Sequence, residues 1–215
     1  GTLLLLKKAL SIGVEKFIHC SSSEVYGTAK YVPMNEDHPT YPHTVYGSSK
    51  LAGEAYARAY YETYNLPTII VRPFNTYGPR SHFEGDAGEM IPKSIIRAIS
   101  GKPILVFGDG SQTRDFTYVK DTAKALFAAS QYEELIGGTF NIGSGFEISM
   151  KKVAEMIREA IGNQSVVVKH EKSRPGDVLR LYADSHLFQK LTNWRIMVPF
   201  HEGLLKTIDS FKSTK

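Results

Sequence analysis

Two side chains that could transfer a proton lie one helical turn apart in this sequence, Tyr46 and Lys50. If the surrounding residues form a helix, this four-residue spacing places the phenol and the ammonium on one face. The cation can then stabilise a phenolate, which is a base able to accept a proton from a hydroxyl group. Such pairs are also common on solvated helix faces, so the neighbouring sequence decides the interpretation.

A hydroxyl-rich run, residues 21–27, precedes this pair and contains Ser21, Ser22, Ser23 and Glu24. It directly follows residues 14–20, which are apolar enough to predict a short buried strand. Open α/β sheets bind their ligands at the carboxyl ends of strands. The run therefore stands where an active site is expected.

The composition is that of an ordinary globular protein. The chain has 215 residues, 42% of them hydrophobic, and a net charge of +4 from 26 basic and 22 acidic residues spread along its length. This mixed excess fits an anionic small ligand and gives no indication of nucleic-acid binding. Cys20 is the single cysteine, and the apolar runs are too short to cross a bilayer. We expect a cytoplasmic protein without membrane segments or a metal site.

Helical and strand patterns alternate along the chain, which favours an α/β fold. The patterns predict helices at 1–10, ending by Gly13, and at 45–64, 91–99, 119–130, 150–161 and 200–211. They predict strands at 14–20, 66–71, 104–107, 139–142 and 166–169.

Five motifs, in this order, resemble the extended short-chain dehydrogenase/reductase family, specifically its NAD-dependent nucleotide-sugar epimerases and dehydratases. They are residues 21–27, Tyr46 with Lys50, residues 72–80, residues 107–116 and residues 174–177. The resemblance implies that residues 1–78 are the C-terminal portion of a Rossmann-like doubly wound parallel sheet. It further implies a smaller α/β substrate-binding domain at 79–215, of which about 113–146 return to pack on the sheet.

Members of this family begin with a strand and a G-x-x-G-x-x-G turn, whose amides hold the pyrophosphate of NAD. No such turn precedes residues 14–20 here. The nearest glycine cluster, Gly143-Ser144-Gly145, follows a late strand and is interpreted as a turn. We therefore expect that part of the usual dinucleotide-binding half is absent.

The resemblance also implies roles for the residues that match the motifs. Tyr46 would take the proton of a sugar hydroxyl, Lys50 would assist it and hold the nicotinamide ribose, and Ser22 would hydrogen-bond the sugar oxygen. An alternative role for Ser22 is a helix or turn cap. The residues expected to contact NAD are Cys20, Ser21, Tyr46, Lys50 and Pro73.

Glu24 bears on the second step of the reaction. Dehydratases of the family typically carry Asp-Glu where this chain has Ser23-Glu24, whereas nucleotide-sugar decarboxylases and some dehydratase relatives carry Ser-Glu. Epimerisation, elimination of water with help from Glu24, and decarboxylation all stay open. A structural alternative for Glu24 is an ion pair with a neighbouring basic group.

The same resemblance implies that the substrate is a UDP- or dTDP-hexose. Asn75, Arg114 and Arg174 would lie beside its diphosphate, Asp177 would accept from the nucleotide ribose, and Phe107 would pack against the base. Asn75 could instead form a turn before Gly78.

A second hypothesis is that the chain is a catalytically silent fragment that only binds nucleotide sugar or self-associates. An incomplete sheet would leave the strand at 14–20 with an unpaired side and would expose apolar helix faces. We therefore expect a homodimer or another form of self-association.

Overall fold

The computed structural model describes residues 1–85, 89–163, 165–173 and 178–213. Its helices are α1 (Thr2–Ile12), α2 (Val45–Tyr64), α3 (Met90–Ile99), α4 (Val119–Gln131), α5 (Met150–Ile161), α6 (His186–Leu191) and α7 (Phe200–Lys212). Its strands are β1 (Phe17–Cys20), β2 (Thr68–Pro73), β3 (Asn75–Tyr77), β4 (Ile104–Phe107), β5 (Thr113–Tyr118), β6 (Thr139–Ile142), β7 (Glu147–Ser149) and β8 (Val168–Glu171). The predicted α/β class is confirmed. Within these residues, no helix combines the length and apolar character that crossing a bilayer requires.

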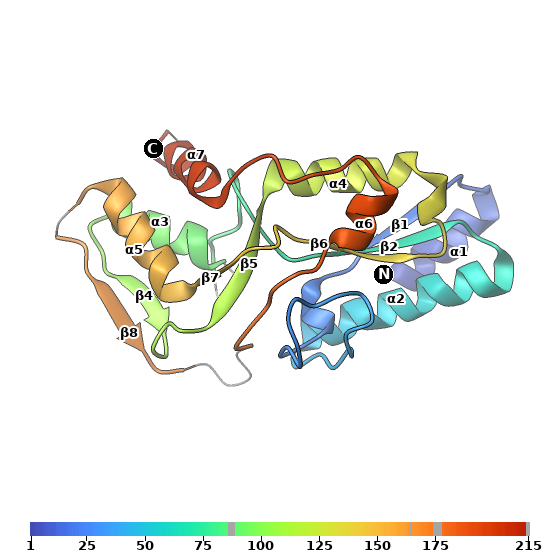
Figure 1. Cartoon of the computed structure of the whole chain (residues 1–215), viewed down its shortest axis with the longest axis horizontal. Coiled ribbons are helices and arrows are strands. Elements are labelled where there is room, and N and C mark those ends of the chain that lie inside the picture. Colours follow the sequence, from blue (N-terminus) through green and yellow to red (C-terminus); the bar gives the residue numbers. More distant parts are fainter. Residues whose placement is uncertain (86–88, 164, 174–177, 214–215) are drawn as a thin grey trace.

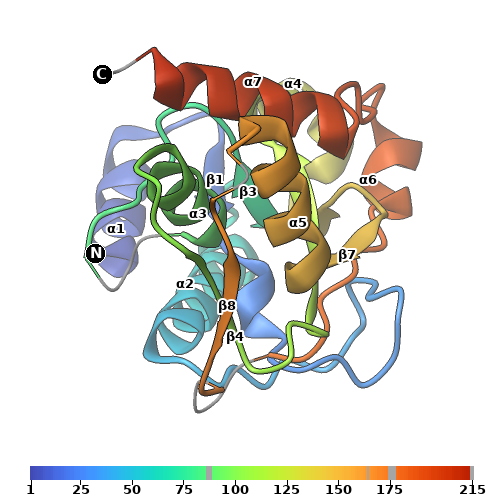
Figure 2. The ribbon, with the colours of Figure 1, turned by 90° about the vertical axis from the view of Figure 1, so that its left-hand side faces the viewer.

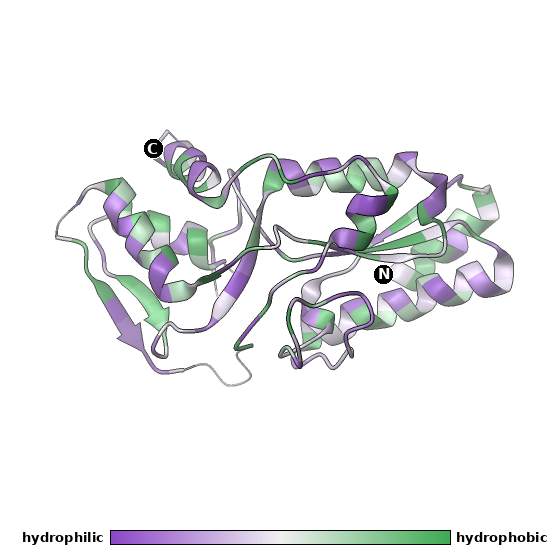
Figure 3. Ribbon diagram, in the orientation of Figure 1, coloured by the Kyte–Doolittle hydropathy of each residue, from purple (hydrophilic) through white to green (hydrophobic). Residues whose placement is uncertain are grey.

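The first lobe is built on a parallel sheet with the strand order β1-β2-β6, seen on the right of Figure 1. Alternate side chains of β2 point to opposite faces of this sheet. Ile69 and Val71 join the core under α4, whereas Thr68 and Arg72 bond to residues of α2. Helices therefore cover both faces, as in a doubly wound sheet, and the apolar strands lie between them (Figure 3).

The helix α2 has clear signals at both ends. The Thr44 side chain caps its start by accepting a hydrogen bond from the Gly47 amide at 3.0 Å. Asn65 ends it in the left-handed conformation, with φ at 53°. The helix α1 packs alongside, where Leu6 contacts a small core around Tyr60. This packing fixes α2, and with it the predicted catalytic pair, against the sheet.

The second lobe contains two smaller sheets and the helices α3, α5 and α7. Strand β4 pairs in parallel with β8, and β5 lies between β3 and β7. Figure 2 views this lobe end-on, with α7 lying across α3 and α5. The lobe's core is made mainly by apolar side chains of these elements, among them Ile95, Ile104, Phe116, Val153 and Leu204.

Three predicted strand bounds were wrong. The segment 14–20 pairs only from Phe17, because Gly13 ends α1 and the next residues connect it to the strand. The strand predicted at 66–71 instead runs from Thr68 to Pro73, and Pro73 pairs with Ile142. The last predicted strand, 166–169, is shifted to Val168–Glu171.

Candidate functional site

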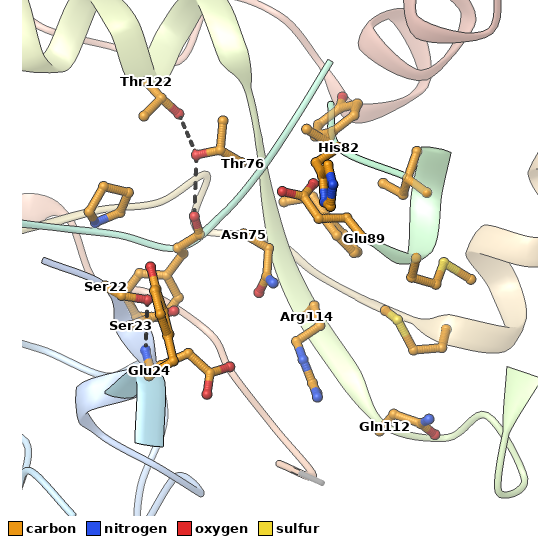
Figure 4. Close-up of a pocket in the computed structure, with 18 of the residues that line it drawn as sticks. Ser22, Ser23, Glu24, Asn75, Thr76, His82, Glu89, Gln112, Arg114 and Thr122 are labelled. Carbon is orange, nitrogen blue, oxygen red and sulfur yellow. Dashed lines mark hydrogen bonds between the residues drawn. The ribbon is translucent and has the colours of Figure 1, made fainter. Parts of the chain in front are cut away.

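The carboxyl ends of β1 and β2 open into a pocket of about 820 Å³ that both lobes line (Figure 4). Every predicted site residue that the structure describes lines it: Cys20, Ser21, Ser22, Ser23, Glu24, Tyr46, Lys50, Pro73, Asn75, Phe107 and Arg114. The remaining two, Arg174 and Asp177, lie outside the described residues. The fold thus gathers side chains from the four motifs that the structure describes around one cavity.

Tyr46 and Lys50 lie on the first two turns of α2 and face this pocket together. The Lys50 ammonium is 5.6 Å from the centre of the Tyr46 ring and donates a hydrogen bond to the Cys20 carbonyl at 2.9 Å. Tyr46 is 53% exposed, so its hydroxyl group can reach a ligand. A phenol and a cation therefore lie together at the end of β1, as the four-residue spacing indicated.

The three serines after β1 have different environments. The hydroxyl of Ser21 is buried and donates to Glu54, whereas Ser23 is buried in the single turn of 3-10 helix at Ser23–Val25. Ser22 caps that turn by accepting a hydrogen bond from the Glu24 amide at 3.2 Å. The predicted cap is therefore confirmed. It does not exclude a ligand, because a capping hydroxyl still has a proton to donate.

The Glu24 side chain points into the pocket (Figure 4). Its carboxylate accepts a hydrogen bond from the hydroxyl of Thr44 at 3.3 Å. Among the described residues its partner is thus a hydroxyl, and the ion pair considered from the sequence is not found there. Since Thr44 also caps α2, one side chain orients both Glu24 and the helix that bears Tyr46.

On the opposite side of the pocket, β3 and β5 present Asn75 and Arg114 (Figure 4). The Oδ1 atom of Asn75 is buried without a hydrogen-bond partner in the described part of the chain, which marks a place for a polar ligand group. The Arg114 guanidinium donates to the Thr113 carbonyl at 2.9 Å and extends into the cavity. The turn predicted for Asn75 is wrong, because this residue begins β3 and pairs with Phe116.

Sequence reasoning did not assign several lining residues, including Gln112, Thr122 and Met150, and it gave His82 and Glu89 no binding role. Gln112 donates to the Phe107 carbonyl at 2.9 Å, so it supports the residue predicted to contact a base. Burial raises the pKa of the Glu89 carboxyl, and nearby His82 opposes this effect. The sequence feature that could have pointed to His82 and Glu89 is the polar, glycine-bearing segment 81–89, in which both lie.

The turn at Gly143-Ser144-Gly145 is already occupied by the protein's own carboxylate. Asp115, which is fully buried, accepts hydrogen bonds from the Ser144 amide and hydroxyl and from the Gly145 amide. Another donor is the Ala183 amide. The prediction that this cluster is a structural turn is confirmed, since its amides hold Asp115 in place.

Comparison with known proteins gives one consistent family. The model of the family described as GDP-mannose 4,6 dehydratase matches residues 1–207. A putative UDP-glucose 4-epimerase of Methanocaldococcus jannaschii is 34% identical over 215 residues, covering 99% of this chain and 68% of that protein. The dTDP-D-glucose 4,6-dehydratase of Homo sapiens is 33% identical over 218 residues, covering 99% and 61%.

Solved structures agree with these matches. The UDP-glucuronic acid 4-epimerase of Bacillus cereus, in complex with UDP-glucuronic acid and NAD, superposes with a TM-score of 0.92 at 32% identity. The match covers all of this chain and 67% of that one. The chain therefore spans about two thirds of the length of the relatives it matches.

Proposed function

Because the chain belongs to the extended short-chain dehydrogenase/reductase family of NAD-dependent nucleotide-sugar epimerases and dehydratases, we propose that its pocket binds a nucleotide hexose whose hydroxyl is deprotonated by Tyr46. One observation carries this proposal. Tyr46, Lys50, Ser22 and Glu24 come from two elements and face one cavity at the carboxyl edge of the parallel sheet. That edge is where α/β enzymes bind their ligands.

Part of an NAD site is available in this chain. Cys20, Ser21, Lys50 and Pro73 line the same pocket as Tyr46 and would hold the nicotinamide end of the cofactor, where Lys50 has donors for ribose hydroxyls. The described residues contain no glycine-rich turn at the start of a helix after β1 that could cradle the pyrophosphate. When bound, NAD supplies the acceptor and donor of a hydride.

The protein's own side chains handle the protons. Tyr46 accepts the proton of the sugar hydroxyl at C4 as a phenolate, which Lys50 stabilises from the next helical turn before the transfer. Ser22, whose oxygen already accepts the Glu24 amide, donates its proton to the sugar oxygen. Tyr46 and Ser22 both act at the C4 hydroxyl of the sugar, and they line one cavity, so a single bound hexose can meet both side chains.

Glu24 provides the chemistry of a second step. Its carboxylate, oriented by Thr44, is placed to remove a proton from C5 if the reaction is a dehydration. Ser23 stands where many dehydratases carry an aspartate, and it is buried. An epimerase needs no such proton transfer, and its product is the C4 epimer. A decarboxylase of the same family remains the alternative.

The far end of the pocket would hold the nucleotide diphosphate. Arg114 is the described cation on that side, and its planar group suits two phosphate oxygens. Asn75 would contribute a further hydrogen bond, and Phe107 would pack on the base. Arg174 and Asp177 stay predicted ligands of the diphosphate and the ribose, respectively.

The experiment uses this chain and, in parallel, the polypeptide as encoded with whatever precedes Gly1. Calorimetry measures binding of NAD and of UDP- and dTDP-sugars, and NMR identifies the product formed from UDP-glucose and dTDP-glucose. A C4 epimer or a 4-keto-6-deoxy sugar from either protein supports the proposal. Binding of nucleotide sugar without NAD binding or turnover in both proteins supports the silent-fragment hypothesis instead.

We also propose self-association and a cytoplasmic location. Strand β1 is at the edge of its sheet among the described residues, and α1 exposes Leu4 and Leu5 by 70% and 62%. Apolar surface of this kind favours contact with another copy. A monodisperse monomer in sedimentation would argue against it.

The single cysteine suits a reducing compartment, which fractionation of cells can check.

A further inference from the structure

The face of α2 that presents Tyr46 and Lys50 continues for one more turn to Glu54. The three residues are spaced by four, so they form one row along the helix. Tyr46 is half exposed in the pocket, whereas Glu54 has no exposed surface. The row thus runs from the site into the protein and ends on a buried carboxylate.

Two side chains bind that carboxylate through three hydrogen bonds. Arg72, from β2, donates through Nε to Oε1 at 2.9 Å and through a terminal nitrogen to Oε2 at 2.6 Å. The hydroxyl of Ser21 donates to Oε1 at 2.5 Å. Ser21 is the residue between β1 and Ser22. Glu54 therefore ties α2 to the ends of both strands that border the pocket.

The guanidinium of Arg72 also has a second partner. Arg72 donates to the Tyr26 hydroxyl at 2.8 Å, and this hydroxyl donates to Asn141 of β6 at 2.7 Å. Burial raises the pKa of Tyr26 to about 12, so its hydroxyl keeps the proton for Asn141. Burial lowers the pKa of Arg72, but the interactions with Glu54 and Tyr26 together outweigh burial and raise the pKa, so the guanidinium stays charged.

A buried ion pair is an expensive way to stabilise a fold. Removing both charges from water costs about as much as their attraction returns, and apolar residues of similar volume often serve equally well. The pair supplies a fixed relative orientation of two side chains, because two parallel hydrogen bonds hold the guanidinium and the carboxylate in one geometry. Its place beside the site makes that geometry useful.

We propose that Glu54 and Arg72 are positioning residues, which set the distance between Tyr46 on α2 and Ser22 at the end of β1. This inference rests on the proposed function, in which both groups act on one sugar carbon. A shift of α2 along the sheet would separate them, and displacements near 1 Å cost about 100-fold in rate. Ser21 completes the device, since it connects Glu54 directly to the serine run.

The test replaces the charges by apolar groups of similar size. In Glu54→Leu/Arg72→Met we expect the melting temperature to stay close to that of the wild type or to rise. We expect kcat to fall about 30-fold or more while KM changes by less than about threefold, because substrate contacts are intact. Ser21→Ala, which leaves the ion pair in place, should give a smaller loss of kcat in the same direction.

A second readout does not depend on catalysis. Hydrogen exchange at the amides of residues 46–50 should accelerate about tenfold in both variants, relative to the amides of α4. Glu62→Gln, at an exposed position of α2, is the matched control and should change neither kcat nor exchange. If no wild-type protein turns over a nucleotide sugar, the proposed function fails, and the exchange data still decide the positioning role.

Three results would overturn the inference. One is a double variant with wild-type kcat per folded molecule and wild-type exchange at residues 46–50. If the double variant does not fold, Ser21→Ala decides instead. Wild-type kcat together with wild-type exchange at residues 46–50 in Ser21→Ala would then overturn the inference. A loss of melting temperature without loss of kcat would likewise show that the pair is structural.

Discussion

The ammonium of Lys50 lies 5.6 Å from the centre of the Tyr46 ring and is held by the Cys20 carbonyl at the end of β1. The pair on α2 is therefore attached to the neighbouring strand, and the cation cannot simply turn to solvent. This attachment distinguishes the arrangement from an ordinary surface pair. Three substitutions and one labelling experiment in the surrounding residues, together with a substitution of Tyr46 itself, test the proposed site.

Glu24→Gln separates the two proposed outcomes. The amide keeps the size and the Thr44 contact but cannot accept a proton. If the enzyme is a dehydratase, kcat should fall by about 100-fold or more. If it is an epimerase, kcat should stay within about threefold. The measurement is product formation by NMR, with Glu62→Gln as control, and loss of all nucleotide-sugar binding would contradict the proton-transfer role.

Arg114→Met should weaken binding of the nucleotide end. Loss of a charge-assisted bond to phosphate costs about 1.5 to 3 kcal/mol, so the Kd for UDP or dTDP should rise by roughly 10- to 100-fold. Calorimetry with the free nucleotide measures this directly. Lys102→Met, at an exposed position outside the pocket lining, is the control. Equal affinities for both variants would show that the diphosphate lies elsewhere.

The single thiol, Cys20, reports occupancy of the pocket. Burial raises the pKa of this thiol, and Lys50 opposes the shift only in part. Because the thiolate is the reactive form, alkylation by iodoacetamide at pH 8 should be slower than that of free cysteine and should accelerate as the pH rises. Mass spectrometry follows the modification. NAD or a nucleotide sugar should protect the thiol, and an unprotected Cys20 at saturating ligand would contradict the site.

The loop before α2 should give stability a specific pH dependence. His38 is 2% exposed; its Nε2 accepts from the Lys30 amide and its Nδ1 donates to the Pro39 carbonyl, each at 2.9 Å. Burial lowers its pKa, as it does for His19. The unfolded chain then takes up protons more readily than the folded chain, so stability is complete above about pH 6.5 and is lost as the pH falls below it.

Urea unfolding at pH 7.5 and pH 5.5 tests this expectation. The wild-type midpoint should fall on acidification, and His38→Gln should reduce that fall at some cost in stability at pH 7.5. His201→Gln, at an exposed position, should retain the full wild-type change. A midpoint that rises on acidification would show that the sign is wrong.

The helices were predicted well because capping residues next to each end in the sequence determine where a helix begins and ends. Thr44 and Asn65 cap α2 at the expected residues, and Gly162 ends α5 in the left-handed conformation. Apolar runs such as Ile104–Phe107 identified the buried strands. These signals need no knowledge of the rest of the chain.

The sequence did not predict β3, β5, β7 or α6. Strand β5 reads Thr-Arg-Asp-Phe-Thr-Tyr, and its polar character reflects function and packing rather than a loop. Arg114 extends into the pocket, and the carboxylate of Asp115 is satisfied by a turn 29 residues away. Contacts of this range leave no local pattern, so propensity misassigns the segment.

The candidate site was predictable as a set of motifs, because the four motifs that the structure describes converge on one pocket. The supporting network was not. Glu54 and Arg72 are 18 residues apart on different elements, and each alone resembles a surface charge in the sequence. Only the packing of α2 on β2 makes them a buried pair.

Replacement of Tyr46 by phenylalanine tests whether this residue is the base of the proposed reaction. The change removes the phenolic oxygen that, as a phenolate, should accept the sugar proton, and it leaves the ring beside Lys50. Turnover of the nucleotide sugar by the encoded polypeptide should fall about 1,000-fold, while calorimetry should give an unchanged Kd for the nucleotide. Turnover by Tyr46→Phe at the wild-type rate would contradict the account.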